Sequence, residues 1–118
     1  MNARDLTADA RLAMRSEFEA EAVRLGADVH TEGDALVAVW PEAGRQTTSA
    51  TLSAADGRLV LTETATVRVP DELPDELVER FGHRAKKVGD LRVHLRMVER
   101  ETGVPLLAPR DELKVVRA

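Results

Sequence analysis

The sequence predicts an α+β fold, in which an N-terminal helix precedes a small antiparallel β-barrel or two-sheet sandwich of five to seven strands. Two observations predict this class. Apolar residues recur at helical spacing up to Gly26, and short β-type segments separated by turn residues follow it. For 118 residues we expect one domain, made of a helical part at 1–26 and a β part at 27–118.

Residues 5–25 are predicted to form an amphipathic helix, and Gly26 stands where such a helix ends. Its apolar stripe has spacings of three and four residues and consists of Leu6, Ala10, Met14, Phe18, Ala22 and Leu25. The stripe is narrow and rich in alanine. It suits close packing either on the β part of the same chain or on a neighbouring subunit, and both alternatives stay open.

Two hairpins are predicted next. Segments 27–31 and 35–40 flank a Glu-Gly-Asp turn, and the second of them is apolar on both faces, which favours a central position in the sheet. A Thr-rich strand that continues through Ser53 and a long β-branched strand at 58–69 flank an Asp-Gly turn, which supplies the positive φ that a hairpin requires.

The second half of the β part contains a long connection and three further predicted strands. A short helix is expected at about 75–81, after Pro74 and before Gly82. Residues 91–98 alternate between apolar and polar side chains, which predicts a strand. The final strands are predicted at 104–107 and 113–117.

Charge is distributed unevenly along the chain. The net charge is −4 overall, but residues 1–79 carry −9 and residues 80–100 carry +5. This asymmetry favours a two-sided surface that steers or docks a charged partner. The candidate interaction face consists of Arg84, Lys86, Lys87, Arg92 and Arg96.

The segment 41–50 contains no large apolar side chain with which to anchor itself. We therefore expect its early part to be mobile and to become ordered on contact with a partner. The residues of this candidate mobile assembly loop are Glu42, Gly44, Arg45 and Gln46.

No pattern of catalytic or metal-ligating residues is present in the sequence. The three histidines lack ligand spacing, there is no cysteine, and no serine lies in a nucleophile elbow. We expect a protein that is not an enzyme and needs no metal or cofactor. The longest apolar run, 35–40, is too short for a membrane span, and no secretory signal is expected.

Several phrases occur in a recognisable order: a hairpin that ends in Trp40-Pro41, the segment Ala-Thr-Val-Arg-Val-Pro at 65–70, and Val88-Gly89-Asp90 leading into 91–98. Together they resemble the head–tail joining proteins of long-tailed bacteriophages, also called head completion, stopper or tail attachment proteins. The resemblance implies a virion structural protein, assembled in the bacterial host cytoplasm. It implies a homo-oligomeric ring, six-fold in that family, that joins the DNA-filled head to the tail and helps to retain the DNA.

The implied partners are portal or adaptor proteins and tail-completion or tail-tube proteins, with DNA passing through the lumen without sequence-specific binding. Stopper, tail-completion and tail-tube roles stay open. An alternative is a small β-barrel that binds nucleic acid or serves as an accessory interaction domain of a bacterial complex. The basic segment suits phosphate contacts, but binding of single strands also needs aromatic platforms, and the chain has three aromatic residues in total.

Overall fold

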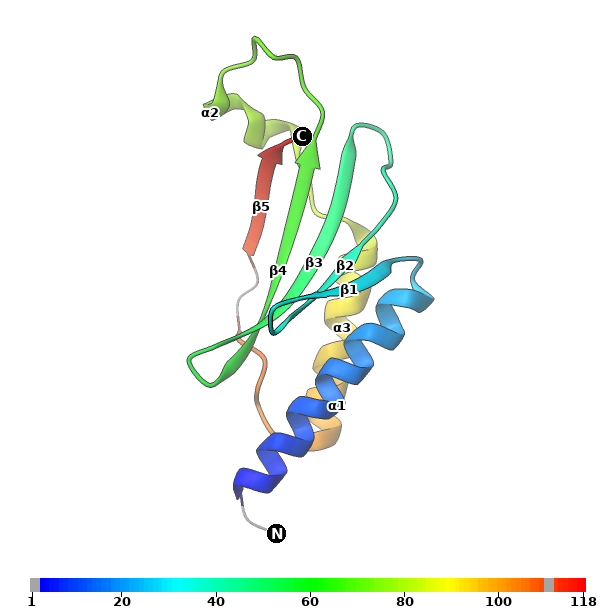
Figure 1. The fold of residues 1–118 in the computed structure, drawn as a ribbon, viewed down its shortest axis with the longest axis vertical. Helices are drawn as coiled ribbons and strands as arrows, with labels where there is room; N and C mark the ends of the chain where they lie inside the picture. Colours follow the sequence, from blue (N-terminus) through cyan, green and yellow to red (C-terminus); the bar gives the residue numbers. More distant parts are fainter. Residues whose placement is uncertain (1–2, 110–111) are drawn as a thin grey trace.

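Five strands form a single open sheet, and two long helices pack against one of its faces in this computed structural model, which describes residues 3–109 and 112–118 (Figure 1). The elements in chain order are α1 (Ala3–Arg24), β1 (Asp28–Glu32), β2 (Ala35–Val39), β3 (Gln46–Ala55), β4 (Arg58–Val67), α2 (Asp75–Val78), the 3-10 turn η1 (Glu79–Phe81), α3 (Lys86–Thr102) and β5 (Glu112–Arg117). The predicted α+β class and its N-terminal helix are confirmed, and the five strands lie within the predicted range of five to seven.

The strands follow one another across the sheet in the order β1-β2-β3-β4-β5. The first four are joined by antiparallel hairpins, as predicted, and β2 lies inside the sheet between β1 and β3. The longest pairing joins β3 to β4 over ten residues each. Its turn has positive φ at both Asp56 (52°) and Gly57 (77°), the conformation that a two-residue hairpin turn requires.

The N-terminal helix α1 packs on its own sheet and on α3 rather than projecting toward a neighbour. Met14, Phe18 and Ala22 from the predicted stripe are fully buried in the core, while the side chain of Leu6 lies outside the described part of the chain. Gly26, with φ of 97°, ends the helix: its N–H donates to the carbonyl of Val23, and the next N–H donates to the carbonyl of Ala22.

The strand predicted at 91–98 is wrong, because this segment lies inside α3. The helix buries Val88, Leu91, Leu95 and Val98, a set with spacings of three and four residues. Leu91 and Leu95 satisfy the helical pattern as well as the alternating one. Val93 and Met97, which the alternation placed inside, are 61% and 52% exposed.

Loss of that strand leaves the sheet unclosed, so the predicted barrel does not form. Instead α3 crosses from the end of β4 to the start of β5, and β5 therefore runs parallel to β4 in a sheet predicted to be wholly antiparallel. The segment 104–107 contributes a single bridge, between Leu107 and Leu59, and not a strand. The short helix predicted at 75–81 is confirmed as α2 followed by η1.

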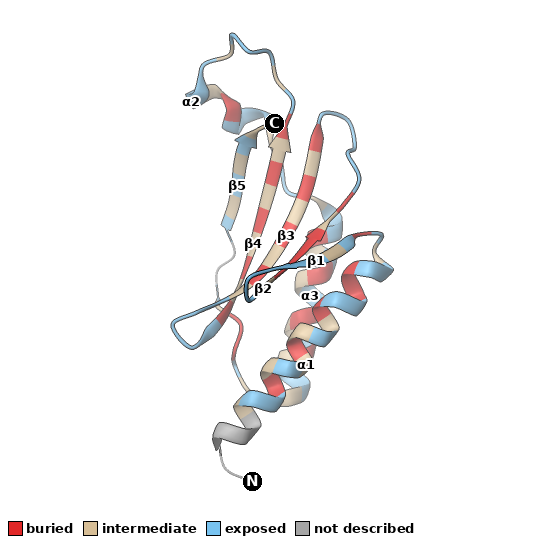
Figure 2. Cartoon of the chain, in the orientation of Figure 1, coloured by how far each residue is buried: buried red, intermediate tan, exposed pale blue. Residues whose placement is uncertain are grey.

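The two faces of the sheet differ in composition. Along β3 and β4, side chains toward the helices are buried and those on the opposite face are half-buried (Figure 2). On this outer face Thr47 lies opposite Thr66, and the next cross-strand pairs are also hydroxyl-bearing. The members of these rows are Thr47, Ser49, Thr51, Thr62, Thr64 and Thr66.

A glycine is required where the chain leaves η1 and passes over β5. A Cβ atom added at Gly82 would lie 2.5 Å from a methyl carbon of Val115, closer than real carbon atoms approach. In contrast, a Cβ atom at Gly89, within α3, would meet no atom closer than 3.9 Å.

Replacement of Gly82 by Ala is expected to destabilise the protein by about 1–3 kcal/mol, because the new methyl group overpacks against Val115. Gly89→Ala is the matched control and should stabilise the protein by up to about 1 kcal/mol, since alanine is the better helix former. Urea unfolding followed by circular dichroism measures both. Equal effects of the two substitutions would contradict the assigned contact.

Candidate functional site

The predicted basic face divides into residues that make internal contacts and residues that stay at the surface. Arg92 and Arg96 belong to the first group, and their side chains are only 26% and 34% exposed. Arg84, Lys86 and Lys87 are exposed around the start of α3. The structure thus brings the five residues to one helix and the loop before it, but not to one open surface.

Arg92 faces a buried carboxylate on the sheet. Glu63, in the middle of β4, is fully buried, and its Oε2 accepts a hydrogen bond of 2.7 Å from the N–H of Ala85. Its Oε1 lies 3.5 Å from an Arg84 nitrogen and 3.7 Å from an Arg92 nitrogen. A buried carboxylate is costly unless it is paired in this way, so Glu63 fixes the start of α3 to the sheet.

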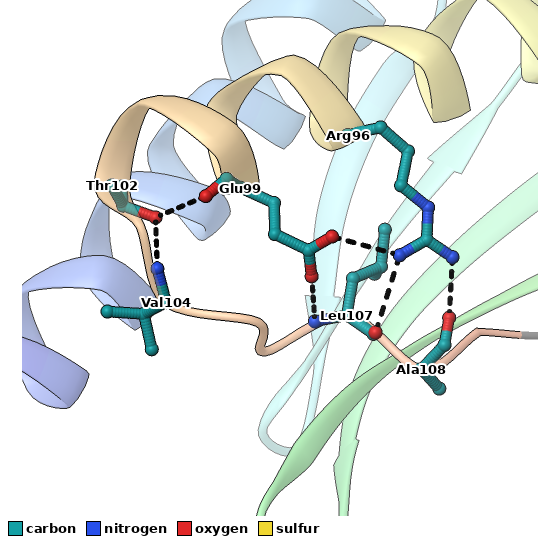
Figure 3. Close-up of polar contacts among 6 residues, drawn as sticks. All are labelled: Arg96, Glu99, Thr102, Val104, Leu107 and Ala108. Carbon is teal, nitrogen blue, oxygen red and sulfur yellow. Dashed lines mark hydrogen bonds and ion pairs between the residues drawn. The ribbon is translucent and has the colours of Figure 1, made fainter.

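Arg96 organises the chain that follows α3 (Figure 3). Its guanidinium donates to the carbonyl of Ala108 at 2.8 Å and contacts Glu99 at 3.1 Å. The other oxygen of Glu99 accepts the N–H of Leu107 at 2.8 Å. These bonds hold the segment between α3 and β5 against the end of the helix, which gives Arg96 a structural role.

The segment expected to lack an anchor is held by polar contacts. Gln46 is buried: its side-chain amide donates to the carbonyl of His83 at 2.8 Å and accepts the His83 N–H at 3.1 Å. Glu42 pairs with Arg68, and the carbonyl of Arg45 accepts the N–H of Arg68 at 2.8 Å. Gly44, with φ of 65°, forms the tip of a tight turn. The segment therefore has polar anchors in place of an apolar one, while its mobility and its ordering on contact with a partner stay predictions.

These contacts form a pocket of about 230 Å³ between the loop after β2 and the start of α3. Trp40, Pro41 and Ala43 form an apolar wall, and His83, Lys86 and Lys87 supply polar and cationic groups. Gln46 and Thr48 also line it. The indole N–H of Trp40, the only tryptophan of the chain, donates to the carbonyl of Leu25 and fixes the orientation of the ring. The pocket combines an apolar surface with positive charge, which suits an acidic group that carries apolar carbon.

A groove of about 520 Å³ lies beside β5. Four consecutive strand residues line it, Leu113, Lys114, Val115 and Val116, and Glu79 of η1 faces them. Within the described residues β5 is the last strand of the sheet, so the backbone groups along its outer edge pair with no further strand. An open edge of this kind is a template for an added strand.

The basic stripe of α3 offers little to nucleic acid. Arg92, Arg96 and Arg100 line a shallow depression with Val93 and Met97, and none of the residues that line it is aromatic. Arg96 is hydrogen-bonded to internal carbonyls, and Arg92 is ion-paired with the buried Glu63. Phosphate binding would have to compete with those contacts.

The three histidines lie apart. His94 joins the two long helices through Glu17 (2.8 Å) and Glu21 (3.3 Å), whereas His30 contacts Glu32 at the exposed edge strand. His83 lines the pocket. Among the described residues, no group of three or more His, Cys, Asp or Glu side chains is placed to hold a metal ion, and no helix is both long and apolar enough to span a bilayer.

Comparison of the chain with family models, curated proteins and solved structures finds no match. The pocket and the groove are thus described by their own geometry. Neither was predicted from the sequence. In the pocket, Trp40 and the two lysines are distant in the chain and meet only in the folded structure, and the same is true of η1 and β5 in the groove. The one available signal was Lys86-Lys87, which the sequence placed in the candidate interaction face.

Charge reversal should affect the unfolding free energy differently in the two groups of basic residues, the internally paired arginines and the exposed lysines. The double variant R92E/R96E is expected to lose at least about 3 kcal/mol of unfolding free energy, because it leaves Glu63 buried beside a like charge. K86E/K87E should remain within about 1 kcal/mol of the parent, because both side chains are exposed and acids suit the start of a helix, so that loss of the exposed Lys86–Asp90 ion pair costs little. Urea unfolding tests both variants. A stable R92E/R96E protein would show that these arginines are not structural.

Proposed function

We propose that this chain is a structural subunit whose copies join through the two unlike edges of the sheet, with β5 of one copy against β1 of the next. The resulting assembly is a ring at a bacteriophage head–tail interface, as the sequence resemblance implies. The groove beside β5 is the observation that carries the proposal, because four successive residues of an edge strand line it. We propose that β1 of the next copy occupies this groove.

The opposite edge of the sheet supplies a matching strand. Within the described part of the chain β1 pairs with β2 alone, and four of its five residues are exposed. Unpaired strand edges form hydrogen bonds with other strands readily, and Thr31 and Val29 carry no charge that would oppose such pairing. Addition of β1 to β5 would continue the sheet from one copy into the next.

Charge favours this pairing over pairing of like edges. Asp28 and Glu32 of β1 and Lys114 of β5 all lie on the outer face of the sheet, as their strand partners Val39, Ala35 and Thr64 indicate. Glu112 of β5 lies on the same face, opposite Thr62, so the favourable contact is the one made by Lys114. Opposite charges on neighbouring strands stabilise a sheet, whereas two β1 edges would place acids against acids. Joining unlike edges is a heterologous contact, which closes into a ring when the rotation between copies permits.

The resemblance to head–tail joining proteins now rests on fewer elements. The Trp40-Pro41 phrase follows β2, and the phrase at 65–70 runs from the end of β4, so both accompany strands. The phrase at 88–98 belongs to α3 and does not contribute a strand. The ring role therefore draws on the sheet edges in addition to the resemblance. A virion location, contacts with portal and tail proteins, and passage of DNA remain parts of the proposal.

Two charge reversals test the joining of unlike edges. The wild-type chain at high micromolar concentration is expected to sediment as a multiple of 12.9 kDa, and both Lys114→Glu and Glu32→Lys should sediment as monomers. A mixture of the two variants should assemble, because the acidic β5 of one then meets the basic β1 of the other.

Glu101→Lys, an exposed reversal at the end of α3, is the matched control and should assemble like the parent. A monomeric wild-type chain, or a mixture that stays monomeric, would contradict the proposed contact. Genes for capsid, portal and tail proteins beside the coding sequence are expected from the phage role, and their absence would remove that part of the proposal.

A further inference from the structure

We infer that the pocket beside α3 receives the acidic segment 71–76 of the next copy in the assembly. This inference rests on the joining of unlike edges proposed above and adds a second contact to it. The contact would insert the exposed ring of Pro74 against the apolar wall of the pocket and would bring the flanking carboxylates to Lys86 and Lys87.

The pocket has the chemistry for such an occupant. Its wall consists of Trp40, Pro41 and Ala43, and its volume of about 230 Å³ admits one side chain of moderate size. Lys86 and Lys87 are exposed beside it; Lys86 also pairs with Asp90 one turn further along α3, at 3.1 Å. A ligand that presents an apolar group between negative charges would match both parts of this surface.

The acidic segment presents that arrangement. Asp71, Glu72, Asp75 and Glu76 are exposed, and Pro74 between them is exposed as well. Leu73 within the segment and Leu77 just after it are partly buried against the chain's own surface. The groups that remain at the surface are therefore one apolar ring with carboxylates on either side.

The segment is held beside β5 and does not line the pocket of its own chain. The guanidinium of Arg117, on β5, donates to the carbonyl of Pro70 at 2.9 Å, to the carbonyl of Leu73, and to Asp75 at 3.3 Å. Figure 1 shows α2 beside β5 and the loop between β2 and β3 apart from it at the same end of the sheet, whose opposite margin is β1. In this arrangement the acidic segment can reach such a pocket only on another copy of the chain.

Joining of unlike edges supplies that copy. A copy attached through its β5 to the β1 edge brings its α2 to the β1 margin, and β1 adjoins β2, which the loop follows. The acidic segment of one copy and the basic pocket of the other then lie on the same side of the junction. The charge asymmetry between residues 1–79 and 80–100 thus becomes a contact between copies.

A peptide tests this contact independently of assembly. The probe is an acetylated and amidated heptapeptide that copies residues 71–77, Asp-Glu-Leu-Pro-Asp-Glu-Leu, added to the dilute full-length chain. Trp40 lines the pocket and is the only tryptophan, so its fluorescence should change with saturation as the peptide binds. The affinity should fall as salt is raised, because the contact depends on screened surface charges.

Two controls make the result specific. K86E/K87E, whose folding is measured separately above, should bind the peptide about tenfold more weakly or not at all. The peptide Asn-Gln-Leu-Pro-Asn-Gln-Leu, which has the same shape without charge, should cause no saturable change. Equal responses to the two peptides, or an undiminished response in K86E/K87E, would overturn the inference.

The two proposals fail in different ways. Assembly of the Lys114→Glu and Glu32→Lys mixture without peptide binding would refute the occupant of the pocket and leave the joining of unlike edges in place. Saturable peptide binding to a chain that never assembles would refute the joining and retain the pocket as a site for acidic, proline-containing segments.

Discussion

Glu63 places a carboxyl group in the middle of the helix-facing side of the sheet, and its burial is tolerable because the start of α3 comes to meet it. The N–H of Ala85 and the guanidinium groups of Arg84 and Arg92 surround the carboxylate. An unpaired ion in this position would cost several kcal/mol. This requirement sets where α3 begins and holds it across the sheet.

The position of α3 determines the two open features of the molecule. Because the helix begins beside the loop after β2, the lysines of its first turn lie next to Trp40 and create the pocket. Because the helix returns the chain to the far side of β4, the last strand is parallel and leaves an unpaired edge beside η1. The pairing of Glu63 with the start of α3 therefore also determines where the pocket and the open edge of β5 lie.

The elements that follow from short-range sequence patterns, such as residue spacing and turn residues, were predicted correctly. The stripe of α1, its Gly26 terminus and both hairpins follow from spacing and turn residues, and all are present. The helix at 86–102 was mistaken for a strand because Leu91 and Leu95 fit either period, and the decisive member, Val98, lay at the end of the segment. The anchor of Gln46 was missed because it is the backbone of His83, a distant partner that composition does not reveal. The pocket was missed for the same reason, because the two groups of residues that line it are distant from one another in the chain.

The rows of threonine and serine on the outer face of the sheet have a consequence for how the chain behaves before it meets a partner. Threonine has the β-branched shape that strands favour, and its hydroxyl group can form hydrogen bonds with water. A sheet with one uncovered apolar face would expose a large hydrophobic patch, and such patches promote nonspecific association. The hydroxyl groups of this face can stay hydrogen-bonded to water, so it offers less apolar area for face-to-face association than a row of valines would.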